Sequence, residues 1–181
     1  SDLGAMLGEL AAADPEAAAR LHPNDRKRIV RALEVFQQTG KTISQHNRET
    51  RALPLRYDAL TLSLAFQRRE DMWARIDRRV DEMMAAGLAE EVRALLDSGV
   101  PVRCTAMQAI GYKEMAAAQR GGGDVCAAAE EIKLRSRQYA KRQLTWFRRT
   151  EGAKWLFWGP EPDFEAACRT STKYLEEFGL V

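Results

Sequence analysis

The sequence predicts an α/β protein of which this chain is the C-terminal part, mostly α-helical with about two strands. Apolar residues recur at helical spacing along most of the chain. Two short segments, residues 59–66 and 154–158, have the composition and patterning of strands. Because a pair of strands is marginally stable alone, and helical segments separate these two, we expect both to belong to a larger sheet. Its other strands are expected outside this chain.

The first part of the chain predicts helices joined by short turns. One helix is expected over residues 2–13 and a short second one up to Leu21. A third begins at Asn24 or Asp25, either of which can cap a helix N-terminus, and Gly40 ends it. These signals define a helical region before the first strand.

The remaining elements follow from punctuation by glycine and proline and from the spacing of apolar residues. In order, they are a connector or short helix at 41–54, a strand at 59–66, helices ending near Gly87 and Asp97, a helix before Gly121, a long basic helix, a strand at 154–158 and a helix at 164–178.

Composition excludes several classes of protein. The 181 residues are 45% hydrophobic and 30% charged, with a formal net charge of +2. No apolar run approaches the roughly 20 residues of a membrane span, and no signal peptide opens the chain. Cys104, Cys126 and Cys168 lie far apart without metal-ligand spacing. We therefore expect a soluble cytoplasmic protein with reduced thiols, no membrane contact and no metal site within this chain.

The densest charge lies between Lys133 and Arg149, which include seven basic residues and no acid. Wound as a helix, the segment separates into a basic side, suited to a polyphosphate partner, and an apolar side on which Trp146 and Phe147 are expected in the core. The basic side carries Arg135, Arg137, Lys141, Arg142, Arg148 and Arg149, and the apolar side Ile132, Tyr139, Ala140, Gln143, Leu144, Trp146 and Phe147. The alternative is neutralisation by acids elsewhere, such as Glu130, Glu131, Glu176 and Glu177.

Four blocks together resemble the tRNA dimethylallyltransferase (isopentenyltransferase) family, in its order and at its spacing. They are residues 22–36 followed by Gly40-Lys41, residues 75–80 with 83–87, residues 107–114, and residues 137–148. The resemblance implies transfer of a dimethylallyl group from dimethylallyl diphosphate to N6 of the adenosine next to the anticodon, with release of diphosphate. It also implies Mg²⁺, a P-loop kinase-like core, a tRNA anticodon stem-loop as partner and a monomeric full-length protein.

On this resemblance, residues 1–54 are the later part of a helical tRNA-binding insertion and residues 55–181 the C-terminal half of the catalytic core. The family's Gly-rich phosphate loop and general-base Asp are not in this chain, so we expect the Mg²⁺ ligands elsewhere and no activity from this chain alone. Thr39-Gly40-Lys41-Thr42 is not a phosphate loop, because Val35 stands where the pattern needs glycine and a helix precedes it.

The resemblance also implies site residues. Arg79 corresponds to an arginine that contacts the diphosphate, where a guanidinium can stabilise the charge of the leaving group; an ion pair with Glu82 is the alternative. Gln108 could read an adenine edge and Tyr112 could stack on a base. The residues expected to contact tRNA are Lys27, Arg28, Ile29, Val30, Arg31, Gln108, Ala109, Ile110, Gly111, Tyr112, Lys113, Lys141, Arg142, Gln143, Leu144, Thr145, Trp146, Phe147 and Arg148.

Two other functions remain open. An adenylate isopentenyltransferase of the cytokinin-forming type would act on a free nucleotide, for which the extended basic surface is excessive. A non-catalytic helical RNA-binding module would explain the basic faces, but it would explain neither the strand at 59–66 nor Arg79.

Overall fold

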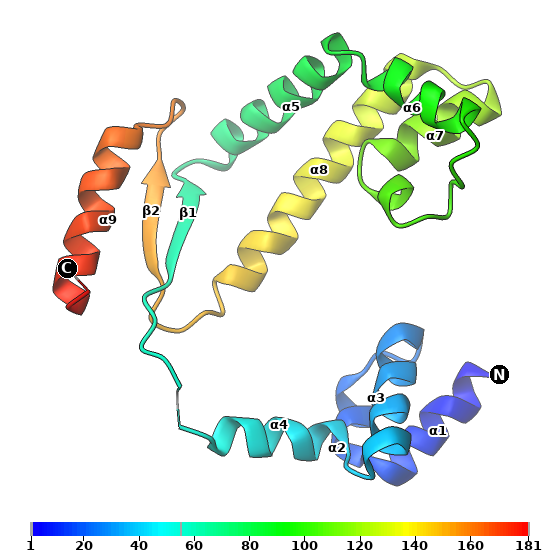
Figure 1. Cartoon of the computed structure of the whole chain (residues 1–181), viewed down its shortest axis with the longest axis vertical. Coiled ribbons are helices and arrows are strands. Elements are labelled where there is room, and N and C mark those ends of the chain that lie inside the picture. Colours follow the sequence, from blue (N-terminus) through cyan, green and yellow to red (C-terminus); the bar gives the residue numbers. More distant parts are fainter. Residues whose placement is uncertain (1, 55, 181) are drawn as a thin grey trace. The chain divides into compact units, whose positions relative to one another are not determined.

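The computed structural model describes residues 2–54 and 56–180, which divide into two compact units, Ser1–Asp58 and Ala59–Val181 (Figure 1). The first unit contains α1 (Leu3–Ala13), α2 (Pro15–Arg20), α3 (Arg26–Thr39) and α4 (Ile43–Ala52). The second contains β1 (Leu62–Phe66), α5 (Arg69–Ala85), α6 (Leu88–Asp97), a short 3₁₀ turn (Ala106–Gln108), α7 (Tyr112–Gly121), α8 (Val125–Phe147), β2 (Lys154–Trp158) and α9 (Phe164–Phe178). The predicted fold class, mostly helical with two strands, is confirmed.

The helices of the first unit begin where side chains cap them. Asp25 accepts from the backbone N–H of Arg28 at the start of α3, and Gly40 ends that helix with a left-handed φ of 69°. The stretch predicted as connector or short helix is α4, because Thr42 and Gln45 form a reciprocal capping box at its start. The unit's core consists of Leu10, Ile29, Ala32 and Leu33.

Asp14 is a buried residue at the end of α1, and it connects this helix to the starts of α2 and α4. Its carboxylate accepts from the backbone N–H of Ala17, at the start of α2, and from that of Ser44, at the start of α4, both at 3.0 Å. Burial raises the pKa of Asp14, but the hydrogen bonds from Ser44 and Ala17 outweigh it, so the pKa lies below its ordinary value. The carboxylate therefore fixes where α4 begins against α2.

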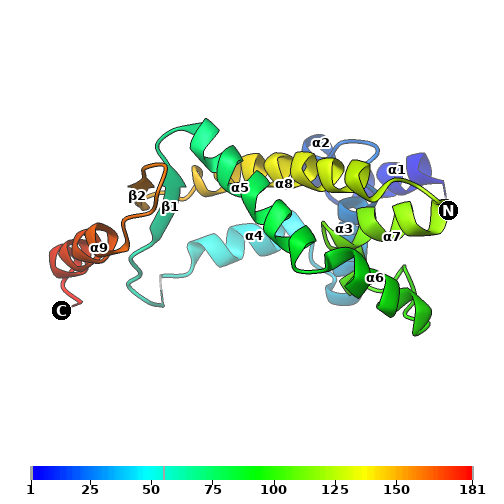
Figure 2. The ribbon, with the colours of Figure 1, turned by 90° about the horizontal axis from the view of Figure 1, so that it is seen from above.

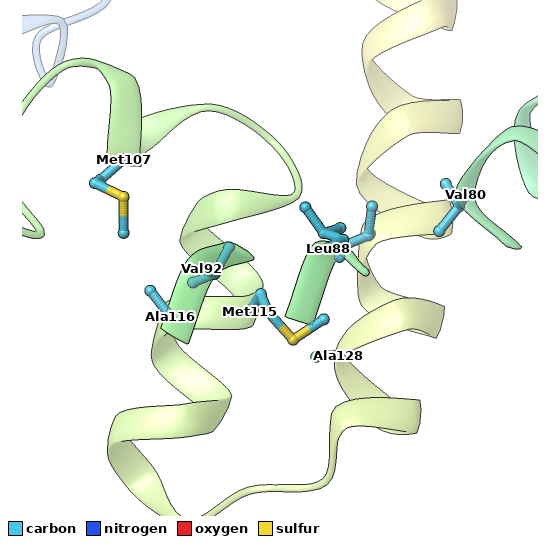
Figure 3. Packing of buried hydrophobic residues seen from close by; sticks show 8 residues of the cluster. Val80, Leu88, Val92, Met107, Met115, Ala116 and Ala128 are labelled. Carbon is cyan, nitrogen blue, oxygen red and sulfur yellow. The ribbon is translucent and has the colours of Figure 1, made fainter. Parts of the chain in front are cut away.

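In the second unit, four helices enclose the main core. Both ribbon views show α5 beside α8, running in the opposite direction, while α6 and α7 gather near the start of α8 (Figures 1 and 2). Figure 3 shows Val92 of α6 meeting Met115 and Ala116 of α7, with Ala128 of α8 close by. Val92 and Met115 are fully buried, so this cluster fixes α6 and α7 against α8.

The two strands pair in parallel, from Leu62 opposite Lys154 to Phe66 opposite Trp158. Strand β1 begins at Leu62, later than the predicted residue 59. The face of β1 that carries the small residues is the buried one, since Ser63 is 6% exposed and Leu64 is 55% exposed. On β2, Phe157 is 58% exposed. Parallel sheets are normally covered on both faces, so this pair has the character of part of a larger sheet. Among the described residues, no helix is both long and apolar enough to cross a membrane.

Candidate functional site

The first half of α8 is tied to α5 by ion pairs. The Nη1 atom of Arg137 donates to both carboxylate oxygens of Asp77 at 2.7 Å. One turn earlier on α8, Lys133 reaches Asp81 at 2.7 Å, and it also donates to Glu130 at 2.8 Å. The pKa of Lys133 is raised, first by the hydrogen bond to Asp81 and then by the one to Glu130. Asp77 and Asp81 are also one turn apart, so two successive ion pairs join the facing sides of α5 and α8.

In its first half the basic side is therefore neutralised, which is the alternative that the sequence left open. Besides Lys133 and Arg137, Arg135 pairs with Glu131 at 2.6 Å. Glu130 and Glu131 were named as alternative partners from the sequence, whereas Asp77 and Asp81 were missed. The one-turn spacing of these two aspartates places them on one face of a helix, but it does not indicate which helix they meet.

The second half of α8 differs. Lys141 and Arg142 on this half, and Arg148 and Arg149 directly after the helix, are all exposed, and none forms an ion pair within the described part of the chain. The Arg142 guanidinium lies 5.6 Å from the ring centre of Tyr139. A shallow hollow of about 420 Å³ is lined by Lys141, Arg142, Thr145, Trp146 and Arg149. Four cations without local anions leave this half able to take an external polyanion.

The basic residues of α8 also divide into two stripes rather than one side. At about 100° per residue, Lys133, Arg137 and Lys141 follow one another by a turn along the side that faces α5. Arg135 and Arg142, two turns apart, line a groove beside α7 instead. The predicted basic side thus presents cations in two directions, and only Lys133 and Arg137 of the first stripe meet acids on α5.

The groove beside α7 brings two of the predicted tRNA segments together. Its volume is about 640 Å³, and Gln108, Ile110 and Lys113 line it together with Arg142. The lining contains three cations (Lys113, Arg135, Arg142) and three acids (Glu114, Asp124, Glu131). Because these charges balance formally, the groove by itself does not favour an anion.

Within the segment 108–113, the structure commits several groups to packing. The side-chain amide of Gln108 donates to the Val102 carbonyl at 2.7 Å. Ile110 and Tyr112 pack against the core. The Tyr112 hydroxyl donates to Glu91, and this hydrogen bond raises the pKa of Tyr112. The geometry therefore gives Tyr112 a packing role rather than the stacking role expected. Gly111 is buried with φ of 105°, a conformation that favours glycine, and Ala109 and Lys113 are exposed.

The expected core position of Trp146 and Phe147 is also wrong. Trp146 is 65% exposed and Phe147 39% exposed, with their rings edge to face at 5.1 Å. The buried residues of α8 are Ala128, Ala129 and Ile132, so its core contacts are made by the earlier turns. Gln143 and Thr145 are exposed as well, and Leu144 is half-buried.

Arg79 lies exposed on α5, and no ion pair with Glu82, or with any other described residue, engages it. Arg75, one turn earlier, is likewise exposed and unpaired among the described residues. In contrast, Arg78 lies 3.5 Å from Glu161. Asp77 points to α8, so Arg75 and Arg79, two residues to either side of it, present their cations away from that helix.

In the first unit, the segment 27–31 divides between core and surface. Ile29 is fully buried and Val30 is half-buried, so their side chains contribute mainly to packing. Lys27, Arg28 and Arg31 are exposed and line a hollow of about 490 Å³. The basic residues of this segment therefore point to a common surface.

No group of three or more His, Cys, Asp or Glu side chains within the described residues is arranged to hold a metal ion. The residues present therefore do not fit a complete Mg²⁺ site.

Known proteins similar to this chain share one family. A family model described as IPP transferase matches residues 1–150. The tRNA dimethylallyltransferase 1 of Trichlorobacter lovleyi is 50% identical over 151 residues, 83% of this chain and 49% of the relative. The tRNA dimethylallyltransferase of Bacillus subtilis is 46% identical over 160 residues, 88% of this chain and 50% of the relative.

Solved structures agree with the sequence relatives. The full-length tRNA isopentenylpyrophosphate transferase from Bacillus halodurans superposes with a TM-score of 0.64 at 34% identity, covering 98% of this chain and 53% of that one. The corresponding enzyme from Staphylococcus epidermidis gives 0.58 at 33% identity, covering 98% and 57%. The chain thus spans about half the length of the relatives that it matches. It belongs to the IPP transferase family.

Proposed function

We propose that the whole protein is a cytoplasmic, monomeric tRNA dimethylallyltransferase, which attaches a dimethylallyl group to N6 of the adenosine next to the anticodon. In this proposal, residues 1–54 are part of the tRNA-binding insertion and residues 55–181 the second half of the catalytic core. The observation that carries it is the set of cations on and directly after the second half of α8 that are unpaired among the described residues, in a chain that belongs to this family.

The chemistry assigned to this chain is binding and charge stabilisation. As the bond between N6 and the prenyl carbon forms, the carbon–oxygen bond to the diphosphate breaks and one proton leaves the amine. Arg79 is free to donate to the departing diphosphate, where negative charge accumulates. The base that takes the proton and the Mg²⁺ of the family belong to the part of the enzyme outside this chain.

The RNA is held through its phosphates by Lys141, Arg142 and Arg148. The target adenine must leave the stack of the anticodon loop to be reached, at a cost of a few kcal/mol. Unpaired cations near the reacting base would offset part of this cost. A non-catalytic RNA-binding module remains the second candidate. Arg75 and Arg79 on α5, which have no ion pair with any described residue, favour the enzyme over it.

A salt titration tests the RNA-binding part of this proposal. The protein is titrated with an anticodon stem-loop carrying adenosine beside the anticodon, and with a guanosine control. We expect a steep loss of affinity with salt, and Lys141→Ala and Arg148→Ala should each reduce the slope by about one unit. Binding that ignores salt and both substitutions would contradict the assignment of α8. Equal affinity for the two RNAs would place base reading outside this chain.

A further inference from the structure

A hollow in the first unit lies where α2, α3 and α4 meet. Its volume of about 490 Å³ lies in the range of small-ligand sites. The apolar part of its lining comes from all three helices and the turn after α2. It consists of Ala17, Leu21, Ala32 and Ile43.

The polar part of the same hollow is entirely basic apart from one amide. Arg20, Lys27, Arg28 and Arg31 line it together with Asn47, and no acid does. The groove beside α7 differs in this respect, since its three lining cations are balanced by three acids. Apolar surface beside four cations is complementary to a ligand that carries both a flat apolar group and negative charge.

The cations around this hollow are available to a ligand. Lys27 has no ion pair within residues 2–54. Arg28 lies 3.4 Å from Asp25 and Arg31 3.8 Å from Glu34. Arg20 likewise lies 3.4 Å from Glu16, and all three pairs are at least partly exposed to solvent. Exposed pairs of this kind contribute little and exchange readily for a better partner.

Arg20 is held at the hollow by the buried network of Asp14. Its Nη2 atom donates to the Ser44 hydroxyl at 3.3 Å, and Asp14 accepts from the Ser44 backbone N–H at 3.0 Å. Asp14 is 4% exposed and Ser44 2% exposed, so the network is fixed within the fold. The guanidinium of Arg20 is thereby positioned before any ligand arrives.

We propose that this hollow binds one unstacked nucleotide of the RNA loop, with its base on the apolar lining and its phosphates on the basic rim. The inference rests on the proposed RNA-binding function and adds Arg20 and Asn47 to the residues that touch RNA. Asn47 supplies both a donor and an acceptor, the pair needed to read the edge of a splayed-out base. Lys27, Arg28 and Arg31 contact the backbone on either side of that base.

The experiment compares a stem-loop RNA with the same RNA whose loop bases are removed while the sugars and phosphates remain. Asn47→Ala should weaken binding of the intact loop about fivefold and leave the abasic loop unchanged. Lys27→Gln should weaken both RNAs equally, by about threefold, and reduce the salt slope by about one. Arg51→Gln is the matched control, because Arg51 is exposed on the same helix, has no ion pair within residues 2–54 and does not line the hollow. Thermal melting confirms that each variant folds.

The outcomes separate this inference from the function on which it rests. If Asn47→Ala changes neither RNA, or both equally, no base enters the hollow, and the inference is overturned while RNA binding stands. If the unsubstituted protein binds neither RNA, the proposed function fails together with the inference. A base-dependent loss confined to Asn47→Ala supports the nucleotide site.

Discussion

The two halves of α8 carry similar positive charge, but their charged side chains have different surroundings. In the first half, Lys133, Arg135 and Arg137 all pair with carboxylates at 2.6–2.7 Å. In the second half and directly after it, Lys141, Arg142 and Arg148 pair with none of the described residues and are exposed. One continuous run of basic residues in the sequence thus performs two tasks. The first half holds the helix against α5, and the second half is the part that we propose binds RNA.

Substitutions of apolar residues should give the largest difference in stability between the two halves of α8. Ile132, in the first half, is 1% exposed, whereas Leu144, in the second, is only half-buried. We expect Ile132→Ala to lower the free energy of unfolding by about 3 kcal/mol, and Leu144→Ala by about 1 kcal/mol or less. Urea denaturation of both variants measures the difference. Similar losses would mean that the second half of the helix is packed as firmly as the first.

Charge substitutions should show the opposite distribution of effects. Arg137→Ala leaves Asp77 without its partner at a partly exposed site, so we expect a loss of stability of about 1–2 kcal/mol. The slope of RNA affinity against salt should not change, because Arg137 is already neutralised. Arg148→Ala should leave stability within about 0.5 kcal/mol and change only that slope.

Exchange of the charges sharpens this prediction. The double variant Asp77→Arg with Arg137→Asp keeps a pair across α5 and α8, and it should recover much of the stability lost in either single variant. A double variant as unstable as the worse single one would show that the ion pair of residues 77 and 137 is not what joins the helices.

The smallest effect concerns pH. The raised pKa of Lys133 means that the folded protein holds this proton more tightly than the unfolded chain does. Its contribution is fully present below the ordinary lysine pKa of about 10.4, and it is lost as the pH rises from there towards the raised value. The stability difference between the protein and Lys133→Met should therefore stay constant from about pH 7 to pH 10 and shrink only above that. A difference that shrinks below pH 9 would contradict the pairing with Asp81.

Local signals in the sequence predicted much of the fold. The strand at 154–158 and the helix at 164–178 have the observed boundaries, and Gly40 ends α3 as expected. α4 was only partly anticipated, because its polar composition hides a helix that begins at the capping box of Thr42 and Gln45. Elements defined by caps and by apolar spacing were thus accessible from the sequence, and those defined by contacts were less so.

The candidate site was less predictable, because it depends on which helices meet. Neither the pairing of Asp77 with Arg137 nor that of Asp81 with Lys133 follows from local sequence, since each joins helices separated by α6 and α7. Trp146 was assigned to the core from its position on the helix, but no element covers it within the described residues. The role of Arg79 in binding diphosphate stays a prediction.

The register of the strand pair has a consequence for the order of folding. Leu62 pairs with Lys154, and four helices lie between them in the chain. Contacts within and between successive helices close short loops, whereas this strand pair closes a long one, which costs more chain entropy. We therefore expect the helices to assemble first and the two strands to join last. In pulse-labelling hydrogen exchange, the amides of β1 and β2 should gain protection after those of α6 and α7.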